Sequence, residues 1–453
     1  MHHKTVFFSL GLLPSLLLCA AHPGRRDTTN LVPLTATNAP DGNFFDVELT
    51  IGGNAFKFLA DTGSSDLWVA HTGFQCFDSS NNTKLASPDV CRYENVAKYD
   101  PATSATFSKV KNETFGVHYG NGIAIGAVGT EQVKLANFTV PRQTFGVADR
   151  ISTPSDGGSS GILGLGYPIL TSAHPGPTVA NDTISLLSNK VIYDPLLIHL
   201  YKLGYIPAWF SLALERLPRG QSTGNGGTLG LGVLPDVKTN GPFVTAPVEV
   251  TEAIPEELAG GKIITEWTLT VDNVIWSTRN SSRTVSATKL NSTSFQAVVD
   301  SGNFFNQLPD KIADEVNAQF APPAKYNRGL DGYIVNCDAV PPSFAVVIAG
   351  TKLVQHPDDM IFQLPTGTCI TNIKRSGDSD GLALNFLGGA WLQSVVAVFD
   401  FGKNEMRFAR RADSNATFNT PSPPTSLAGQ LEALGFRATG ALALLMSGLY
   451  ALG

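Results

Sequence analysis

The sequence predicts an all-β protein built from two related lobes, and three observations lead to that prediction. Apolar residues alternate with polar ones over short runs that end at glycine, proline or asparagine, which is typical of strands. The 453 residues exceed the usual size of one domain, so two lobes are expected. A short motif that contains an aspartate also occurs once in each half of the chain.

The strands are expected in a definite order, with few helices between them. Residues 47–51 alternate, residues 52–54 form a turn, and residues 56–60 return as a second strand. Further turn-bounded apolar runs predict strands at 132–140, 228–234, 263–276 and 395–408. Apolar residues at helical spacing predict short helices at 195–203 and 312–320.

The composition excludes several classes of protein. Only 15% of the residues are charged, the formal net charge is −6, and 26 residues are phenylalanine. Such a chain is neither disordered nor a coiled coil. No run rich in Lys and Arg provides a surface for nucleic acid, so no nucleic-acid partner is expected. No apolar stretch is long enough for a transmembrane helix in the mature protein.

The N-terminal residues have the order of regions that a secretory signal peptide has. Residues 1–21 combine a weakly basic start, an apolar region and the small pair Ala20-Ala21, although a buried N-terminal helix is the alternative. Residues 22–30 would be a short pro or linker segment, with Arg25-Arg26 as a dibasic processing site. Seven glycosylation sequons suit a secreted glycoprotein. They begin at Asn81, Asn112, Asn137, Asn181, Asn280, Asn291 and Asn415.

The C-terminal residues resemble a lipid-anchor signal. Residues 413–437 form a Ser/Thr/Pro-rich spacer, and residues 438–453 form an uncharged tail rich in leucine and alanine. Ser426 has suitable spacing for attachment but is followed by a leucine, whereas Asn415 begins a triplet of small residues far from the tail. The sequence therefore predicts a secreted protein that is held at the cell surface by a GPI anchor, with an ordinary apolar tail as the alternative. Any contact with a membrane would be through that anchor.

Four cysteines remain after the signal peptide is removed: Cys76, Cys91, Cys337 and Cys369. An even number in an oxidising compartment predicts two disulfides, and the spacing favours two local loops, 76–91 and 337–369. Zinc binding is the competing interpretation, but the chain has no Cys-x-x-Cys pair and no histidine cluster nearby. We therefore expect no metal site and no cofactor.

The repeated motif joins an aspartate turn to a later apolar-apolar-glycine segment. Asp61-Thr62-Gly63 follows the apolar run 58–60, and Asp300-Ser301-Gly302 follows the apolar run 297–299. Each copy precedes, by about a hundred residues, a second shared segment. These later segments are Ile162-Leu163-Gly164 and Phe386-Leu387-Gly388.

Two such turns have a chemical use if they meet. Two adjacent carboxyls share one proton, because like charges so close cannot both ionise easily. One carboxylate can then take a proton from water while its protonated partner hydrogen-bonds a substrate carbonyl. Asp61 and Asp300 are the candidates, and two purely structural aspartate turns are the alternative. A Gly-x-Ser-x-Gly match at 157–161 lacks the strand–turn–helix context of serine hydrolases and is set aside.

With these motifs, the chain resembles the pepsin-like aspartic proteases, most closely the secreted fungal members, over residues 31–412. Residues 61–69 match the first catalytic motif, 117–122 the flap hairpin, 161–168 the segment that closes the first lobe, and 300–302 the second catalytic turn. The loop between Cys337 and Cys369 matches the usual disulfide of the second lobe. The resemblance implies two pseudo-symmetric β-barrel lobes, 31–220 and 221–412, with an active-site cleft between them. It also implies a monomer that cleaves polypeptides.

The resemblance also implies roles for individual residues. Asp61 and Asp300 would be catalytic, and Thr62 and Ser301 would lock the two turns together by hydroxyl hydrogen bonds. Further supporting residues would be Ser64 and Asn303, bonded to the outer carboxylate oxygens, and Trp68, in contact with the flap tyrosine. Substrate would be contacted by Gly63, Tyr119, Gly120, Asn121 and Gly302.

Three departures from the family pattern have consequences. Asn303 replaces a threonine or serine, and Gly389 replaces an aspartate found in many acid-active members. Because only Arg25-Arg26 precedes the apparent start of the lobes, the family's long inhibitory prosegment is not expected. The first two predict an acidic optimum at about pH 4 to 6, above that of the stomach enzymes. The uncharged Asn121 on the flap predicts apolar residues on both sides of the cleaved bond. A surface-binding protein with weak or no catalytic activity is the alternative function.

Overall fold

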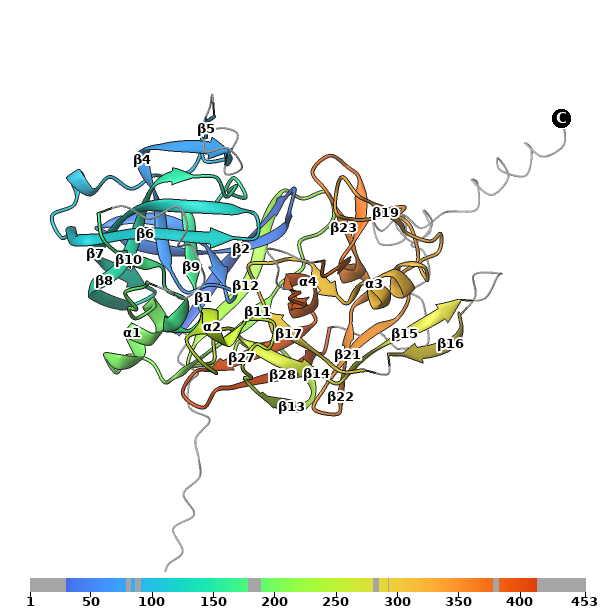
Figure 1. Ribbon diagram of the computed structural model, residues 1–453. Helices are drawn as coiled ribbons and strands as arrows, with labels where there is room; N and C mark the ends of the chain where they lie inside the picture. Colours follow the sequence, from blue (N-terminus) through green and yellow to red (C-terminus); the bar gives the residue numbers. More distant parts are fainter. Residues whose placement is uncertain are drawn as a thin grey trace, which may run out of the picture.

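The computed structural model describes residues 30–78, 83–85, 91–177, 189–279, 285–291, 293–377 and 383–413. Figure 1 shows a mostly β molecule of two lobes, with blue to green strands in one and yellow to red strands in the other. The expected signal peptide and apolar tail lie outside the described residues, as do the spacer beyond Asp413 and four of the sequon asparagines. Among the described residues, no helix is long and apolar enough to cross a membrane.

The described residues up to Lys202 contain ten strands and one α-helix. In chain order these are β1 (Leu31–Ala39), β2 (Gly42–Ile51), β3 (Asn54–Asp61), β4 (Leu67–Asp78), β5 (Thr83–Lys84), β6 (Ser108–Tyr119), β7 (Gly122–Leu135), β8 (Phe138–Ile151), β9 (Gly161–Gly164), β10 (Ala173–Pro175) and α1 (Leu196–Lys202).

The later part of the described chain contains the remaining strands and helices. They are β11 (Trp209–Leu214), β12 (Thr223–Leu231), β13 (Thr239–Pro247), α2 (Glu256–Ala259), β14 (Thr268–Val271), β15 (Asn273–Arg279), β16 (Val285–Leu290), β17 (Phe295–Val299), β18 (Asn306–Leu308), α3 (Asp310–Asn317), β19 (Lys325–Asn327), β20 (Gly332–Ile334), β21 (Phe344–Ile348), β22 (Thr351–Gln355), β23 (Ile361–Gln363), β24 (Cys369–Thr371), β25 (Ile373–Arg375), β26 (Phe386–Leu387), α4 (Gly389–Leu392), β27 (Val395–Asp400) and β28 (Glu405–Arg411).

One large sheet joins the two lobes. It has fifteen strands and runs from β10 through the first lobe to β1, then through β12, β11, β27 and β28 to β13. Three smaller sheets, one of five strands and two of four, complete the second lobe. Strands from both ends of the chain therefore share one sheet, which connects the two lobes.

The sequence repeat corresponds to a repeated strand pairing. β3, which ends at Asp61, pairs in parallel with β9, so that Asp61 lies opposite Gly164. β17, which ends one residue before Asp300, pairs in parallel with β26, so that Val299 lies opposite Leu387. Each aspartate strand is therefore held by the apolar-apolar-glycine segment that follows it in sequence.

Several predicted strands are divided by tight turns. The run 132–140 contains the end of β7 and the start of β8, with Ala136 in the left-handed region at φ 52°. The run 263–276 contains both β14 and β15, and 395–408 contains the hairpin of β27 and β28. The apolar pattern correctly identified strands here, but it contained no clear signal for the turns. The predicted helices are confirmed as α1 and α3.

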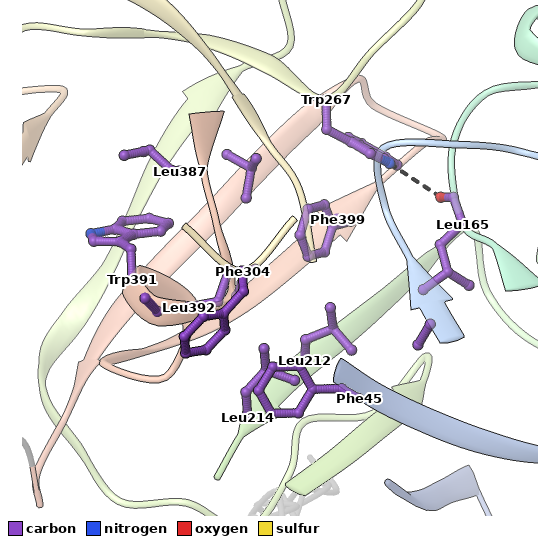
Figure 2. Packing of buried hydrophobic residues seen from close by; sticks show 14 of the residues in the cluster. Phe45, Leu165, Leu212, Leu214, Trp267, Phe304, Leu387, Trp391, Leu392 and Phe399 are labelled. Carbon is purple, nitrogen blue, oxygen red and sulfur yellow. Dashed lines mark hydrogen bonds between the residues drawn. The ribbon is translucent and has the colours of Figure 1, made fainter. Parts of the chain in front are cut away.

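The hydrophobic core extends beneath both aspartate turns. Figure 2 shows aromatic side chains from β2, β27, α4 and the segment before β14 packed together, with Phe45, Phe399 and Trp391 all fully buried. The indole nitrogen of Trp267 donates to the carbonyl of Leu165 at 3.1 Å, which links the two lobes. Phe210 and Phe399 stack with ring centroids 4.8 Å apart.

Both predicted disulfides are present. Cys76 bonds to Cys91 and Cys337 bonds to Cys369, with Cα–Cα distances of 6.0 and 5.2 Å. The first ties the end of β4 to the segment before β6, and the second ties the β20 region to β24. Each closes a local loop, which restricts the unfolded chain more than the folded one.

Candidate active site

The two aspartate turns face each other across the lobe interface. A Cβ atom added to Gly63 would lie 2.6 Å from Cγ of Asp300, and one added to Gly302 would lie 2.6 Å from Cγ of Asp61. Any larger residue at either glycine would overlap the opposite carboxyl. The close approach of the two backbones therefore requires glycine at both positions, and it brings both carboxyls into one site.

Reciprocal hydrogen bonds lock the turns together. Thr62 Oγ1 donates to the carbonyl of Val299 at 2.8 Å, and the backbone N–H of Ser301 donates to Thr62 Oγ1 at 2.9 Å. On the other side, Ser301 Oγ donates to the carbonyl of Ala60 at 2.7 Å, and Thr62 N–H donates to Ser301 Oγ at 3.1 Å. Both hydroxyls are thus satisfied as donor and acceptor in a buried interface, as their predicted role requires.

Asp61 receives donors on both carboxylate oxygens. The backbone N–H of Gly63 donates to Oδ1 at 2.8 Å, and the hydroxyl of Ser64 donates to Oδ2. Burial raises the pKa of Asp61 above its usual value, while the bonds from Ser64, Asp300 and Gly63 oppose that rise. Ser64 therefore makes the predicted contact with the outer oxygen.

Asn303 does not make the side-chain contact that the sequence predicted. Its Oδ1 accepts from the backbone N–H of Phe305 at 3.3 Å, so the amide caps its own turn. Asp300 instead receives backbone N–H groups, from Gly302 at 2.8 Å and from Asn303 itself. An asparagine side chain tends to bond the backbone two residues ahead, and that local bond competes with the longer reach to Asp300.

The two carboxyls differ in their affinity for a proton. Burial and then the charge of Asp61 raise the pKa of Asp300 well above its usual value, and only backbone donors oppose the shift. Asp61 has the additional hydroxyl donor, so its anion is the better stabilised. Asp300 is therefore the member of the pair with the higher affinity for a proton.

The flap tyrosine reaches the site from the β6–β7 hairpin. Tyr119 ends β6, and Gly120 and Asn121 form the exposed tip before β7 begins at Gly122. The Trp68 indole N–H donates to the Tyr119 hydroxyl at 2.8 Å. Burial, followed by the charges of Asp66 and Asp61, raises the pKa of Tyr119 well above its usual value, so it remains a neutral hydroxyl.

The tip of the flap is hydrogen-bonded to residues that follow β8. Asn121 Oδ1 accepts from the Thr153 hydroxyl at 3.0 Å, and the N–H of Ile123 donates to Ser152 Oγ at 2.8 Å. These bonds attach the flap to the segment that follows β8. The 157–161 glycine-serine match belongs to the same connection and leads into strand β9 rather than a helix, which agrees with its rejection as a nucleophile motif.

Gly389 begins the short helix α4 in a closed environment. A Cβ atom there would lie 3.0 Å from Cε2 of Phe45 and 3.1 Å from Cδ2 of Phe304, two rings visible in Figure 2. An aspartate at this position would need these rings to move. Aromatic rings from both lobes therefore fill the space that an acidic side chain at position 389 would need.

The sequence did not indicate a role for two acidic side chains that lie near the site. Asp66 is fully buried and accepts from the Tyr193 hydroxyl and, at 2.8 Å, from the Ser172 N–H. Glu266 lies just before Trp267, and the charges of Asp300 and Asp61, added to burial, raise its pKa well above the usual value. Asp66 is part of the quoted 61–69 motif, whereas no pattern in the sequence marked Glu266.

The fold and the site together define a class, the two-lobed hydrolases that use a pair of aspartates. The family model described as eukaryotic aspartyl protease matches residues 45–411. A probable aspartic-type endopeptidase from Aspergillus fumigatus is 36% identical over 399 residues, covering 86% of this chain and 82% of the relative. Rhizopuspepsin-1 from Rhizopus niveus is 28% identical over 367 residues, covering 80% and 77%.

The fold has a counterpart of known structure. The crystal structure of the aspartic proteinase from Irpex lacteus superposes with a TM-score of 0.61 at 19% identity, covering 86% of this chain and 99% of that one. This chain belongs to the eukaryotic aspartyl protease family and is an aspartic-type endopeptidase.

Proposed function

We propose that the enzyme hydrolyses peptide bonds with a water molecule activated between Asp61 and Asp300. The observation that carries the proposal is the reciprocal placement of the turns, in which each carboxyl faces the glycine of the other. The two carboxyls are hydrogen-bonded unequally, so we assign them different roles. One is ready to accept a proton and the other to donate one.

The proposed reaction has two steps. Asp61 takes a proton from water, the water oxygen bonds to the carbonyl carbon, and Asp300 gives its proton to the carbonyl oxygen. The product of this step is a neutral tetrahedral diol. The proton on Asp61 then moves to the nitrogen, the C–N bond breaks, and one diol hydroxyl returns a proton to Asp300. Tyr119 closes over the chain and excludes bulk water.

A statine-type transition-state analogue tests this mechanism directly. Its hydroxyl would occupy the position of the attacking water between the two carboxyls. We expect it to bind the enzyme and to abolish peptide cleavage, as a competitive inhibitor. Cleavage that continues at saturating inhibitor would contradict a site at Asp61 and Asp300.

We propose that the enzyme prefers apolar residues on both sides of the cleaved bond at acidic pH. Asn121 at the tip of the flap carries no charge, and its side chain is already engaged by Thr153. A peptide-library profile near the optimum measures this preference. A profile dominated by Lys or Arg at the cleavage site under these acidic conditions would rule it out.

The proposed optimum is about pH 4 to 6, because one proton must be shared between the two carboxyls. Of the two substitutions from which the sequence predicted this optimum, only Gly389 still supports it, because the Asn303 side chain bonds Phe305 and not Asp300. A pH–rate profile on an unstructured peptide avoids effects of substrate unfolding. A maximum below about pH 3, or a plateau beyond about pH 8, would contradict this proposal.

We also propose that the enzyme is secreted, glycosylated and GPI-anchored as a monomer. Two disulfides support an oxidising compartment. Asn112 and Asn137 are exposed and accessible to glycosylation, whereas Asn291 accepts from the Val274 N–H at 2.5 Å. Release from intact cells by a phosphatidylinositol-specific phospholipase, with a mass shift on deglycosylation, tests the anchor and the glycans. The alternative of an inactive surface-binding protein is not favoured, because the carboxyl pair is intact.

A further inference from the structure

Glu266 is tied to both catalytic turns through its neighbour in sequence. The N–H of Val299, the residue before Asp300, donates to the carbonyl of Trp267 at 2.9 Å. The indole of Trp267 donates to the carbonyl of Leu165, as Figure 2 shows, and the N–H of Leu165 donates to the carbonyl of Asp61 at 2.7 Å. The position of Glu266 is therefore fixed relative to the catalytic pair.

One carboxylate oxygen of Glu266 is left without a partner in the part of the chain that the structure describes. Its Oε2 atom is closed off from solvent and has no hydrogen-bond partner among the described residues. The side chain as a whole is only half-buried, so part of it remains accessible. A carboxyl that is desolvated and unpaired is costly when ionised, and its pKa rises accordingly. Something outside the described protein atoms is needed to stabilise the anion.

Lys190 is the cation whose charge acts on Glu266, but it does not pair with it. Its Nζ lies 3.4 Å from the carbonyl of Leu170 and 3.5 Å from Ser172 Oγ. The charge of Asp66 acts on Lys190 more strongly than that of Glu266, while burial lowers the pKa of the lysine. No ion pair within 4.0 Å joins Lys190 to Glu266 in the described part of the chain. Lys190 therefore offsets Glu266 only in part.

We infer that Glu266 is a specificity-determining residue that binds a cationic side chain, Lys or Arg, of a peptide bound across Asp61 and Asp300. This inference rests on the proposed function, because the substrate chain must pass over the catalytic pair. Charges influence each other strongly only over short distances in a partly buried site. Because Trp267, the next residue, accepts a hydrogen bond from the residue before Asp300, we expect the cationic residue to lie close to the cleaved bond.

The titratable groups around Glu266 give the preference a pH dependence. Asp61 and Asp300 disfavour its ionisation, and Lys190 favours it. At the acidic optimum Glu266 holds a proton and accepts an apolar side chain, which agrees with the proposed apolar preference. As pH rises, Glu266 ionises and the subsite selects a cation.

The experiment compares matched peptides that carry Lys or norleucine at each position from three residues before to three residues after the cleaved bond. These side chains have similar length and differ in charge. We expect kcat/KM for Lys over norleucine to rise roughly tenfold between pH 4 and pH 7 at one position. In Glu266→Gln the ratio at that position should stay flat with pH.

The matched control is Glu257→Gln, which removes the same charge from the exposed surface of α2. It should retain the wild-type rise. An equal rise in Glu266→Gln, or no rise at any position in the wild type, would overturn the inference. Failure of the proposed function would look different, because neither the Lys nor the norleucine peptide would then be cleaved.

Discussion

The two catalytic turns share one scaffold but differ in the residue that follows each glycine. Both aspartates end strands held in parallel by an apolar-apolar-glycine segment, and both turns exchange hydroxyl hydrogen bonds across the interface. In the first turn, the residue after glycine is Ser64, which bonds its own aspartate. In the second it is Asn303, which bonds Phe305 instead.

The pseudo-symmetry of the lobes pairs the two carboxyls, but it does not make them different from each other. The repeated scaffold brings two chemically equal carboxyls together, and equal carboxyls would share a proton without preference. One hydroxyl on one side breaks that equality, so Asp300 has the higher affinity for a proton. The pseudo-symmetry accounts for the pairing of the two carboxyls, and the asymmetry accounts for their unequal affinity for a proton.

The largest expected effect follows from removing either carboxyl. Asp61→Asn or Asp300→Asn should lower kcat/KM by about a thousandfold or more, because an amide cannot share the proton or act as base. Thermal unfolding of each variant should remain close to wild type, since the amide retains the shape of the carboxyl. Activity within tenfold of wild type in either variant would contradict the assignment.

The next effect concerns the hydroxyls that lock the turns. Thr62→Ala and Ser301→Ala should each lower the free energy of unfolding by about 1–3 kcal/mol, because each leaves buried backbone groups unpaired. The two losses should not add, since both residues belong to one network. Denaturant unfolding of the two variants and their combination measures this. Fully additive losses would show that the turns are held independently.

A smaller effect tests the asymmetry itself. Ser64→Ala removes a donor to the Asp61 carboxylate, so the pKa of Asp61 should rise and the acidic limb of the pH–rate profile should move up by about one pH unit. Asn303→Ala should leave that limb in place, because its side chain contacts the backbone of Phe305. Equal shifts in both variants would mean that the two turns are electrostatically equivalent.

The sequence predicted the paired turns well because their chemistry is local. Asp-Thr-Gly and Asp-Ser-Gly each specify a turn, and the later glycine segments specify their partner strands, so the repeat was sufficient. The hydrogen bond of Asn303 was predicted wrongly because its side chain accepts from the backbone N–H of Phe305 instead of donating to Asp300, a local choice that the sequence pattern does not reveal. Glu266 could not be predicted, because its proximity to Asp300 depends on the pairing of Trp267 with Val299 and with Leu165.

A second carboxyl pair, Asp46 and Asp156, provides a contrast within the first lobe. Burial, and then the charge and hydrogen bond of Asp156, raise the pKa of Asp46 well above its usual value. Burial also acts to raise the pKa of Asp156, but hydrogen bonds from Asp46, Ser159 and Gly158 outweigh it and lower that pKa. We therefore expect Asp46 to hold a proton that it donates to the Asp156 carboxylate. This pair lies beside the segment that restrains the tip of the flap.

The sign of the resulting pH dependence follows from the raised pKa. Because the folded protein holds the Asp46 proton more tightly than the unfolded chain does, Asp46 stabilises the fold at acidic pH. That contribution is lost as pH rises through the folded-state pKa. Asp46→Asn keeps a permanent donor toward Asp156 and has no proton to lose. The melting temperature of this variant should therefore fall less steeply than that of wild type as pH rises from 4 to 7.

The expected difference at neutral pH is small, about 2–4 °C in melting temperature for a lobe of this size. Asp156→Asn is the informative comparison, because it removes the anion but leaves Asp46 in place. The Asp156 carboxylate also accepts from the N–H groups of Gly158 and Ser159 at 2.9 and 2.7 Å, so its loss should lower the melting temperature even at pH 4. If Asp46→Asn instead melted with the wild-type slope, the proton between the two carboxyls would have no part in the acid stability of the lobe.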